Sequence, residues 1–493
     1  MSGVGGELPK GWVRVRLGDI LDRIEAGKSY KCEPRPAGPD EWGVIKVSAM
    51  TWGDFDESEN KAVPAGFAHN PDYEIKPGDI LLSRANTAAY VGAPVLVKQC
   101  RPRLLLSDKS LRLLPAEGVD REWLAYLLSS PSVRSQISER ATGTKDSMRN
   151  ISQGALAEIE CLLPPQEEQR RIVTALEEQL SRLDAAVDFI EASRLRVSQL
   201  WASVLEQVAQ GTLARISQQP VPWVRTDSVA VVQGGIQKQS RRRPVDNKFP
   251  FLRVANVPRG HLALDEVHEI ELFGDEIERY RLQAGDLLVV EGNGSPDQIG
   301  RAALWRGEIK DCVHQNHLIR IRPGEDLRPT FLELIWNSPS VTAKLKRVAS
   351  STSGLHTLST AKIKAVEIPT PPLEEQDALV TAANVWMAKQ LAAEVAQTDA
   401  LARSSALRRS LLSEAFAGRL VPQDPNDEPA EELLARIRAE REAAAPKKRR
   451  SRRAPAQRKA THDEAPAAPP APANTPTKPL TGEQPTLDLE FPS

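Results

Sequence analysis

Two long stretches of the chain carry the apolar pattern of extended helices. Residues 166–209 contain neither proline nor glycine, so nothing in this stretch should break a helix. Apolar side chains recur there at intervals of three and four, interrupted only at Arg194: Val173, Leu176, Leu180, Leu183, Val187, Ile190, Val197, Trp201, Val204 and Val208. A seam sustained over about five heptads predicts a coiled coil.

A second stretch of similar length, about 373–416, is richer in alanine and less regular. Its apolar stripe consists of Leu379, Trp386, Leu391, Val395, Leu401, Leu407 and Leu411. At about 1.5 Å per residue each helix should be roughly 65 Å long. Because one chain supplies both helices, we expect them to pair antiparallel with each other; a zipper between two copies of the chain is the alternative. Each helix should end at a glycine, Gly211 or Gly418.

The residues before each long helix carry the pattern of strands. Short apolar runs, such as 43–47, 79–82 and 91–97, are separated by Gly, Pro, Asn and Asp, which are typical of turns. The pattern predicts an α+β protein with two β-rich domains, residues 8–163 and 216–370. Each is followed by a helical segment, residues 164–215 and 371–421.

The two halves of the chain are copies of one module. VIKV at 44–47 matches FLRV at 251–254, an offset of 207 residues, and GDILL at 78–82 matches GDLLV at 285–289. LPPQEEQ at 163–169 matches TPPLEEQ at 370–376 at the same offset. An ordered series of matches at nearly one spacing indicates a duplication.

Bulk properties narrow the class of protein. A chain of 493 residues is too long for one core. Its formal net charge of −1 is uninformative, because local segments differ in sign. The four cysteines form no CxxC pair, which favours a reducing cytoplasm over a disulfide framework or a zinc site. Neither a signal peptide nor an apolar run long enough to span a membrane is visible.

The composition changes beyond about residue 422. Residues 431–442 are a charged run of helix formers, and residues 447–459 contain eight Lys or Arg. Residues 443–493, rich in Ala and Pro, are predicted to be disordered. The basic run could attract phosphates without regard to sequence; a solvated tail with no specific role is the alternative. The stretch QPTLDLEF at 484–491 is a candidate docking segment.

The catalytic motifs in the chain are incomplete. AGKS at 26–29 lacks the first glycine of a phosphate-binding loop, because Asp22 stands in its place. Asp297, Glu308 and Lys310 fit the loose pattern of a metal-dependent nuclease, but the first module has no equivalent. His314 and His317 should lie on opposite faces of a strand, which is poor geometry for one metal. We therefore expect no catalytic residue and no metal site.

The polar residues of both modules are concentrated in loops that suit DNA. Arg and Lys reach phosphates or guanine, and Asn and Gln pair with adenine. Equivalent loops differ between the modules, with SRAN at 83–86 against EGNG at 291–294. This is expected if the shared scaffold, called the frame below, presents different DNA-contacting loops in each module. The candidate DNA-binding residues are Lys28, Tyr30, Lys31, Arg84, Asn86, Lys109, Lys145 and Arg149 in the first module, and Lys238, Arg241, Arg242, Arg243, Asn293, Ser295, Asn316, His317 and His356 in the second.

The chain resembles the specificity subunits of type I restriction-modification systems. The resemblance lies in the repeated order of domain and Pro-Pro-x-Glu-Glu-Gln helix. It also lies in the phrases FLRVANV (251–257), EGNGSPDQIGRAALW (291–305) and QNHLIRIR (315–322), and it covers about residues 8–421. It implies two target-recognition domains that contact the halves of a split, asymmetric duplex target, and a coiled coil that spaces them.

The resemblance also implies partners. Methyltransferase subunits, two of them, would dock on the helices and carry S-adenosylmethionine, and they would methylate adenine after flipping the base. Motor-nuclease subunits would use ATP and Mg²⁺ to cut unmethylated DNA. The chain itself would bind no cofactor and would not be an enzyme. A metal-dependent nuclease and a coiled-coil protein scaffold are the alternative functions.

Overall fold

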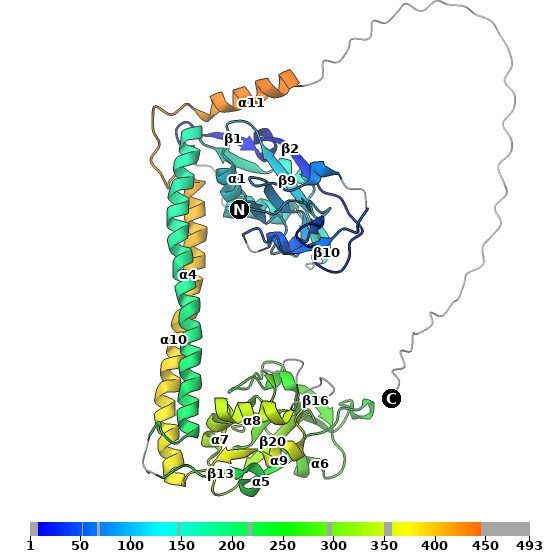
Figure 1. Ribbon diagram of the computed structural model, residues 1–493, viewed down its shortest axis with the longest axis vertical. Coiled ribbons are helices and arrows are strands. Elements are labelled where there is room, and N and C mark those ends of the chain that lie inside the picture. The colour runs from blue at the N-terminus through cyan, green and yellow to red at the C-terminus, as the bar shows by residue number, and fades with distance from the viewer. Residues whose placement is uncertain are drawn as a thin grey trace, which may run out of the picture. The chain divides into compact units, whose positions relative to one another are not determined.

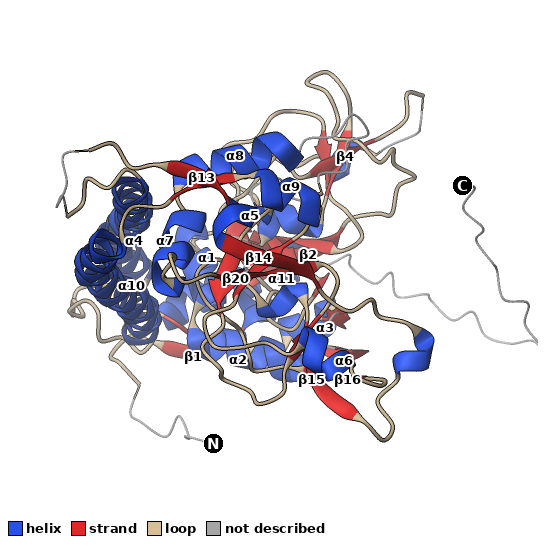
Figure 2. Cartoon of the chain, turned by 90° about the horizontal axis from the view of Figure 1, so that it is seen from below, coloured by secondary structure: helices blue, strands red, loops and turns tan. Residues whose placement is uncertain are grey.

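The computed structural model describes residues 8–51, 53–66, 70–145, 148–214, 219–292, 298–349 and 357–444, without the side chains of residues 144 and 145. The two β-rich domains and the two long helices that the sequence predicts are present (Figures 1 and 2). None of the described helices is long and apolar enough to cross a membrane.

The first domain is built from a four-stranded antiparallel sheet, in the order β2-β9-β5-β7, and three smaller sheets, in the orders β4-β3-β8, β10-β11-β6 and β1-β12. The strands are β1 (Val13–Arg16), β2 (Leu21–Ala26), β3 (Gly43–Ile45), β4 (Asn60–Ala62), β5 (Ile80–Ser83), β6 (Ala85–Asn86), β7 (Pro94–Leu96), β8 (Leu104–Leu105), β9 (Ser110–Pro115), β10 (Thr142–Lys145), β11 (Met148–Asn150) and β12 (Glu160–Leu163). The helices are α1 (Arg121–Ser129), α2 (Pro131–Arg140), α3 (Gln153–Ala157) and the 3-10 turns η1 (Leu17–Ile20), η2 (Val47–Met50) and η3 (Pro71–Tyr73).

The second domain repeats this topology. Its sheets have the orders β14-β20-β17-β18, β16-β15-β19 and β13-β21, which correspond to three sheets of the first domain. The strands are β13 (Trp223–Arg225), β14 (Ala230–Gly234), β15 (Lys248–Leu252), β16 (His268–Glu271), β17 (Leu287–Val290), β18 (Ala302–Leu304), β19 (Val313–His314), β20 (Leu318–Pro323) and β21 (Glu367–Pro369). The helices are α5 (Thr226–Val229), α6 (Glu276–Tyr280), α7 (Pro329–Trp336), α8 (Pro339–Ala349), α9 (Thr360–Ala365) and the 3-10 turns η4 (Ser240–Arg242) and η5 (Val254–Asn256).

The central strands are apolar without interruption because both of their faces are buried. In β5, Ile80 and Leu82 pack into a core that includes α1 and α2, whereas Leu81 packs into a second core with residues of β7 and β8. In β17, Leu287 and Leu288 divide between two cores in the same way. Successive side chains of a strand point to opposite faces, so a run of consecutive apolar residues is the pattern of a strand with core on both sides.

The long helices α4 (Gln166–Ala209) and α10 (Leu373–Ala415) pack against each other in antiparallel orientation. Two contacts between the helices show the antiparallel direction: Asp184 pairs with Arg408, and Ser193, further along α4, bonds to Gln397, which lies earlier in α10. The first half of α4 contributes to the core of the first domain, and its last turns contribute to the core of the second. The helix bounds and the pairing predicted from the sequence are confirmed.

The contact face of α10 differs from the predicted stripe. Leu379 is fully buried, but Leu391, Val395 and Leu407 are 62%, 55% and 50% exposed. The pairing face runs through Gln397 instead, which is 8% exposed and donates a hydrogen bond of 3.1 Å to Ser193. A stripe chosen by apolar character alone misses a polar position whose partner lies on the other helix.

The repeated Glu-Glu-Gln sequence joins each long helix to its domain. The side chain of Gln169 donates to the carbonyl of Pro164 and accepts from the backbone N–H of Asp120, which caps α1. Gln376 makes the same pair of contacts, with Pro371 and Arg328. Both glutamines are fully buried, so these contacts fix the start of the long helix against the first turn of a domain helix.

A further helix, α11 (Ala430–Ala444), covers the first domain. Leu433, Leu434 and Ile437 are buried in the core of that domain, and the N–H of Ala430 donates to the carbonyl of Gly11. The charged run predicted at 431–442 is therefore an amphipathic helix, and it continues two residues into the segment predicted to be disordered. The rest of that segment, residues 445–493, lies outside the described residues.

Candidate nucleic-acid interface

Hydrogen bonds between backbones gather four loops of the first domain. A bridge joins Lys28 to Ser107, and the N–H of Arg84 donates to the carbonyl of Lys109 at 2.9 Å. Arg149 on β11 pairs with Asn86 on β6. Five predicted site residues, Lys28, Arg84, Asn86, Lys109 and Arg149, therefore come from four loops that meet at one place.

The second domain gathers its loops through the same contacts. A bridge joins Ile236 to Gln315, and the N–H of Glu291 donates to the carbonyl of His317 at 2.9 Å. The N–H of Asn316 donates to the carbonyl of Ile236, also at 2.9 Å. The frame places Glu291 where the first domain has Arg84, and His317 where it has Lys109. We refer to the loops joined by these contacts as the loop clusters. The first contains Lys28, Arg84, Asn86, Ser107, Lys109 and Arg149, and the second contains Ile236, Glu291, Gln315, Asn316 and His317.

The two loop clusters carry different chemistry on one frame. In the first, Lys28 and Lys109 are exposed and Arg84 is half-buried. In the second, Nδ1 of His317 lies 3.0 Å from Oε2 of Glu291, so a carboxylate and an imidazole replace two cations. His314 belongs to no shared site with His317, because it is fully buried and burial lowers its pKa to about 3.

Two predicted site residues are engaged inside the protein. Both terminal nitrogens of Arg242 lie 2.7 Å from the carboxylate of Glu276, and its side chain is 9% exposed. This pair lowers the pKa of Glu276 to about 2. Arg149 donates to the carbonyl of Ala141, at the end of α2, at 2.7 Å. Both arginines therefore hold loops in place, and the prediction that Arg242 faces DNA is revised to a supporting role.

The remaining predicted residues are scattered or lie outside the description. Arg241 and Arg243 are exposed, but η4 packs beside β16 and not within the second loop cluster. Lys31 and Lys238 are exposed near the loop clusters, and Tyr30 is half-buried. Asn293, Ser295 and His356 lie outside the described residues, as does the side chain of Lys145.

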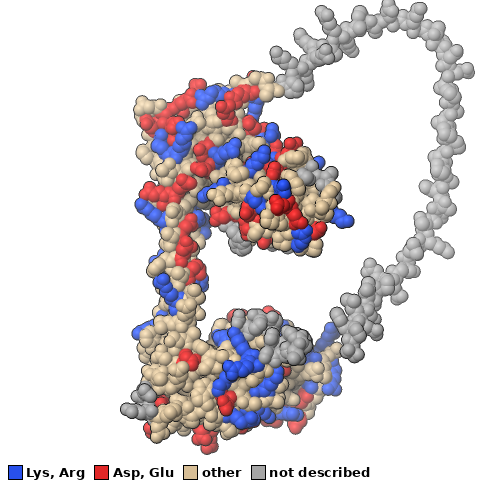
Figure 3. Space-filling view, viewed as in Figure 1, with Lys and Arg blue, Asp and Glu red and all other residues tan. Residues whose placement is uncertain are grey.

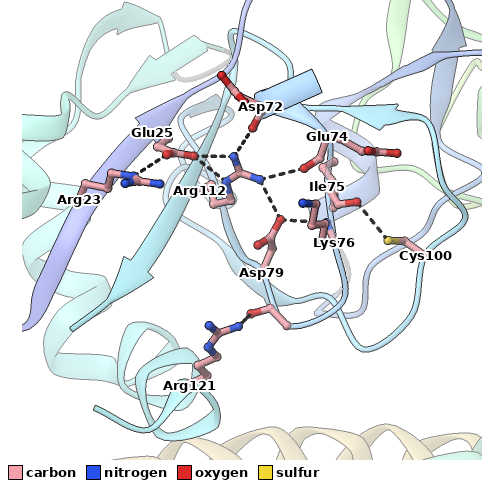
Figure 4. Close-up of polar contacts among 11 residues, drawn as sticks. Arg23, Glu25, Asp72, Glu74, Ile75, Lys76, Asp79, Cys100, Arg112 and Arg121 are labelled. Atoms are coloured by element: carbon pink, nitrogen blue, oxygen red, sulfur yellow. Dashed lines mark hydrogen bonds and ion pairs between the residues drawn. The ribbon is translucent and has the colours of Figure 1, made fainter. Parts of the chain in front are cut away.

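A buried arginine, Arg112, links several segments of the first domain (Figure 4). Arg112 on β9 donates two hydrogen bonds to Glu25 on β2, at 2.8 and 2.5 Å, and one to Asp79 at 3.1 Å. It also donates to the backbone carbonyls of Asp72 and Glu74. Burial raises the pKa of Glu25, but the hydrogen bonds from Arg112 and Arg23 outweigh burial, so its net pKa lies below 4.5.

The second domain has a corresponding cluster of charged residues with a different balance of arginines and carboxylates. Arg322 forms a bidentate pair with Asp286, with both distances 2.7 Å, and Arg320 donates to Gln233 and to the carbonyl of Arg281. Gln233 thus stands opposite Arg320 where the first domain has the carboxylate of Glu25 opposite Arg112. Figure 3 shows Lys and Arg gathered over the second domain on the face in view, whereas acidic and basic side chains mix on the first.

The structure also shows cationic residues that the loop argument missed. A cavity of about 440 Å³ in the first domain is lined by Lys28, Tyr30 and Lys109 together with Lys46 and Lys61. Lys46 follows β3 and Lys61 lies on β4, so neither belongs to a variable loop. The sequence match between VIKV (44–47) and FLRV (251–254) could have indicated Lys46, because both segments have a basic residue at the same place.

The residues considered for a nuclease do not assemble into a site within the described part of the chain. The carboxylate of Glu308 accepts the N–H of Arg306, and Lys310 is exposed. Asp297 lies outside the described residues. Among the residues that are described, no group of three or more His, Cys, Asp or Glu is placed to hold a metal ion.

A duplicated frame that presents two different polar loop clusters is typical of a protein that binds two different sites. The family model of the type I restriction-modification DNA specificity domain matches residues 9–194 and 224–382. The chain therefore belongs to this family, and the interpretation of the duplication as a repeated DNA-specificity module is confirmed.

Individual relatives agree with this assignment over nearly their whole length. The chain is 26% identical over 470 residues to the specificity subunit of the type I restriction enzyme EcoKI from Escherichia coli K12, with 90% of this chain and 98% of that protein covered. It is 25% identical over 465 residues to the StySPI specificity subunit from Salmonella potsdam, with the same coverage. A solved chain from a study of complex assembly in the type I R-M system shares the fold, with a TM-score of 0.62, 21% identity and 84% of this chain covered.

Proposed function

We propose that the chain selects a bipartite, asymmetric duplex DNA target, with each domain contacting one half. The observation that carries this proposal is the pair of loop clusters: equivalent in backbone and different in side chains, with Arg84 and Lys109 in one and Glu291 and His317 in the other. Arg and Lys suit guanine or phosphate, whereas a carboxylate suits cytosine. Different readers on one frame are expected to select different half-sites.

Partner subunits supply the chemistry in this proposal. Two methyltransferase subunits, with S-adenosylmethionine, dock on the helix pair and methylate adenine, and motor-nuclease subunits, with ATP and Mg²⁺, cut unmodified DNA. The number two is supported by the repeat, since each module brings its own junction of domain and long helix through Gln169 or Gln376. The chain is then a non-catalytic subunit that binds no cofactor and works in the cytoplasm.

The test is to express the chain with its methyltransferase partner and to map the methylated bases. The expected result is a split motif with one adenine in each half. Arg84→Ala should relax the motif in one half only and His317→Ala in the other half only, because each lies in a different loop cluster. A lost base contact should reduce discrimination at its position by about 1–3 kcal/mol.

Lys98→Ala is the matched control, since Lys98 is exposed in the first domain and lies outside its loop cluster. An unsplit motif would contradict the bipartite proposal. A change in both halves from either single substitution would contradict the assignment of one domain to each half.

A further inference from the structure

One cation occupies the same place in both domains although the loops around it differ. Lys46 directly follows β3 and precedes η2, and Arg253 directly follows β15 and precedes η5. Each pairs with a glutamate just before the neighbouring strand: Lys46 with Glu59 at 3.3 Å, and Arg253 with Glu266 at 3.2 Å. The positive charge therefore belongs to the frame and not to a variable loop.

A second basic residue accompanies this cation in each domain. Lys61 lies opposite Val44 across β3 and β4. His268 occupies the same register on β16, opposite Phe251, and its Nε2 lies 2.9 Å from Oε1 of Glu266. The equivalence of the two places thus extends over two strands.

In the first domain these residues open onto the loop cluster. The cavity of about 440 Å³ is lined by four lysines, residues 28, 46, 61 and 109, against two carboxylates, Glu33 and Asp108. Lys46 and Lys61 line the part formed by the strands, and Lys28 and Lys109 line the part formed by the loops. A polyanion that touches the loop cluster therefore also meets the frame cations.

The ion pairs of Lys46 and Arg253 are partly open to solvent. Lys46 and Glu59 are 35% and 36% exposed, and Arg253 and Glu266 are 29% and 79% exposed. Ion pairs this open to solvent contribute little to stability. A positive charge that stands at the same place in both domains, in ion pairs that contribute little to stability, points to a shared ligand.

We propose that Lys46 and Arg253 are equivalent phosphate contacts that hold the DNA backbone in the same position against both domains. The inference rests on the proposed DNA-binding function and deepens it. Phosphate contacts set the position of a protein on a duplex and carry no sequence information, whereas base contacts specify. The chain divides these two tasks between different residues. Lys46 and Arg253 place a positive charge at the same position in both domains, whereas the loop clusters differ, with Arg84 in one and Glu291 in the other.

The test uses the full chain in complex with its methyltransferase partner and the variants Lys46→Gln, Arg253→Gln and both together. Binding is measured to a duplex with the mapped target and to a scrambled duplex, between about 50 and 200 mM salt. Each single substitution should weaken binding to both duplexes by the same factor, roughly tenfold at low salt. Each should also reduce the slope of log affinity against log salt by about 1, and the double variant by about 2.

Three controls separate this role from a structural one. Lys46→Arg and Arg253→Lys keep the charge and should keep the affinity and the salt slope. Lys76→Gln and Lys310→Gln remove exposed cations away from the cavity and should change neither. All variants should melt close to the wild-type temperature, because the ion pairs removed are only partly buried.

The outcomes distinguish the two proposals. A loss confined to the target duplex, or a motif that relaxes at one base, would make Lys46 or Arg253 a base reader and overturn the phosphate assignment. Unchanged binding to both duplexes would remove these residues from the interface while leaving the proposed function intact. If the wild-type complex bound neither duplex, the proposed function itself would fail.

Discussion

Replacing Arg112 by methionine tests whether the buried ion cluster holds the first domain together. The arginine is 9% exposed, and it contacts Glu25 and Asp79, which are 23% and 17% exposed. Removing one partner of a buried ion pair costs about 3–5 kcal/mol, because the other charge stays buried. Here Glu25 keeps its contact with Arg23, and Asp79 still accepts the N–H of Lys76. We therefore expect a loss at the lower end, about 3 kcal/mol in the free energy of unfolding of the first domain.

The loss should depend on pH with a definite sign. In the wild-type protein the pKa of Glu25 is lowered, so this residue stabilises the fold above pH 4.5, and this stabilisation disappears as the pH falls through the folded pKa. Without Arg112 burial still raises the pKa of Glu25 while the strongest opposing contact is gone. The ionised carboxylate then destabilises the variant at neutral pH, and its protonation as the pH falls relieves part of the loss. The difference from wild type should therefore shrink as the pH falls.

Native-state hydrogen exchange resolves this prediction by domain. The free energy of opening is read from β2 and β9, which Arg112 joins, with β20 of the second domain as an internal reference. Arg121→Met is the matched control, because the exposed Arg121 makes only a 3.0 Å contact with the carbonyl of Gly78 and should cost less than about 1 kcal/mol. A loss for Arg112→Met no larger than this control, or one that stays constant with pH, would refute the reasoning.

Two further predictions concern the helices. Gln397→Leu should raise the stability of the helix pair by about 1 kcal/mol, because Oε1 of Gln397 is buried without a hydrogen-bond partner; a lower melting temperature would show instead that its contact with Ser193 outweighs that cost. Leu433→Ala should cost about 2–4 kcal/mol, or free α11 from the first domain, because Leu433 is 2% exposed. Hydrogen exchange of residues 430–444 measures this, with the exposed Glu431→Ala as control, and unchanged exchange in both variants would contradict the docking of α11.

The sequence alone determined the parts of this protein that rest on local periodicity and on the repeat. The long helices begin and end where proline and glycine allow, and Gly211 and Gly418 have the positive φ angles, +68° and +71°, that end a helix. The strands lie at the predicted apolar runs, and the repeated matches correspond to repeated sheets. These features depend only on residues close together in the sequence or on the similarity of two stretches, so they can be predicted from the sequence pattern.

The roles of individual charged residues were decided only by the tertiary structure. Arg242 and Arg243 are adjacent and alike in sequence, but Arg242 pairs with Glu276, 34 positions away, while Arg243 is exposed. The sequence did not mark Lys46 as a binding residue, because it directly follows a strand and does not lie in a variable loop. Its place in the wall of the cavity follows only from the tertiary structure.

The same limit applies to α10 and α11, whose covered faces depend on distant segments. The stripe on α10 was assigned by apolar character, but its contact face is set by where α4 lies, and Gln397 belongs to it because Ser193 is opposite. The charged run of α11 has its apolar side covered by the first domain, more than 250 positions earlier in the chain. Whether a side chain is buried depends on which distant segment covers it. Periodicity fixes the element and the face that can be buried, and the tertiary fold decides which partner covers that face.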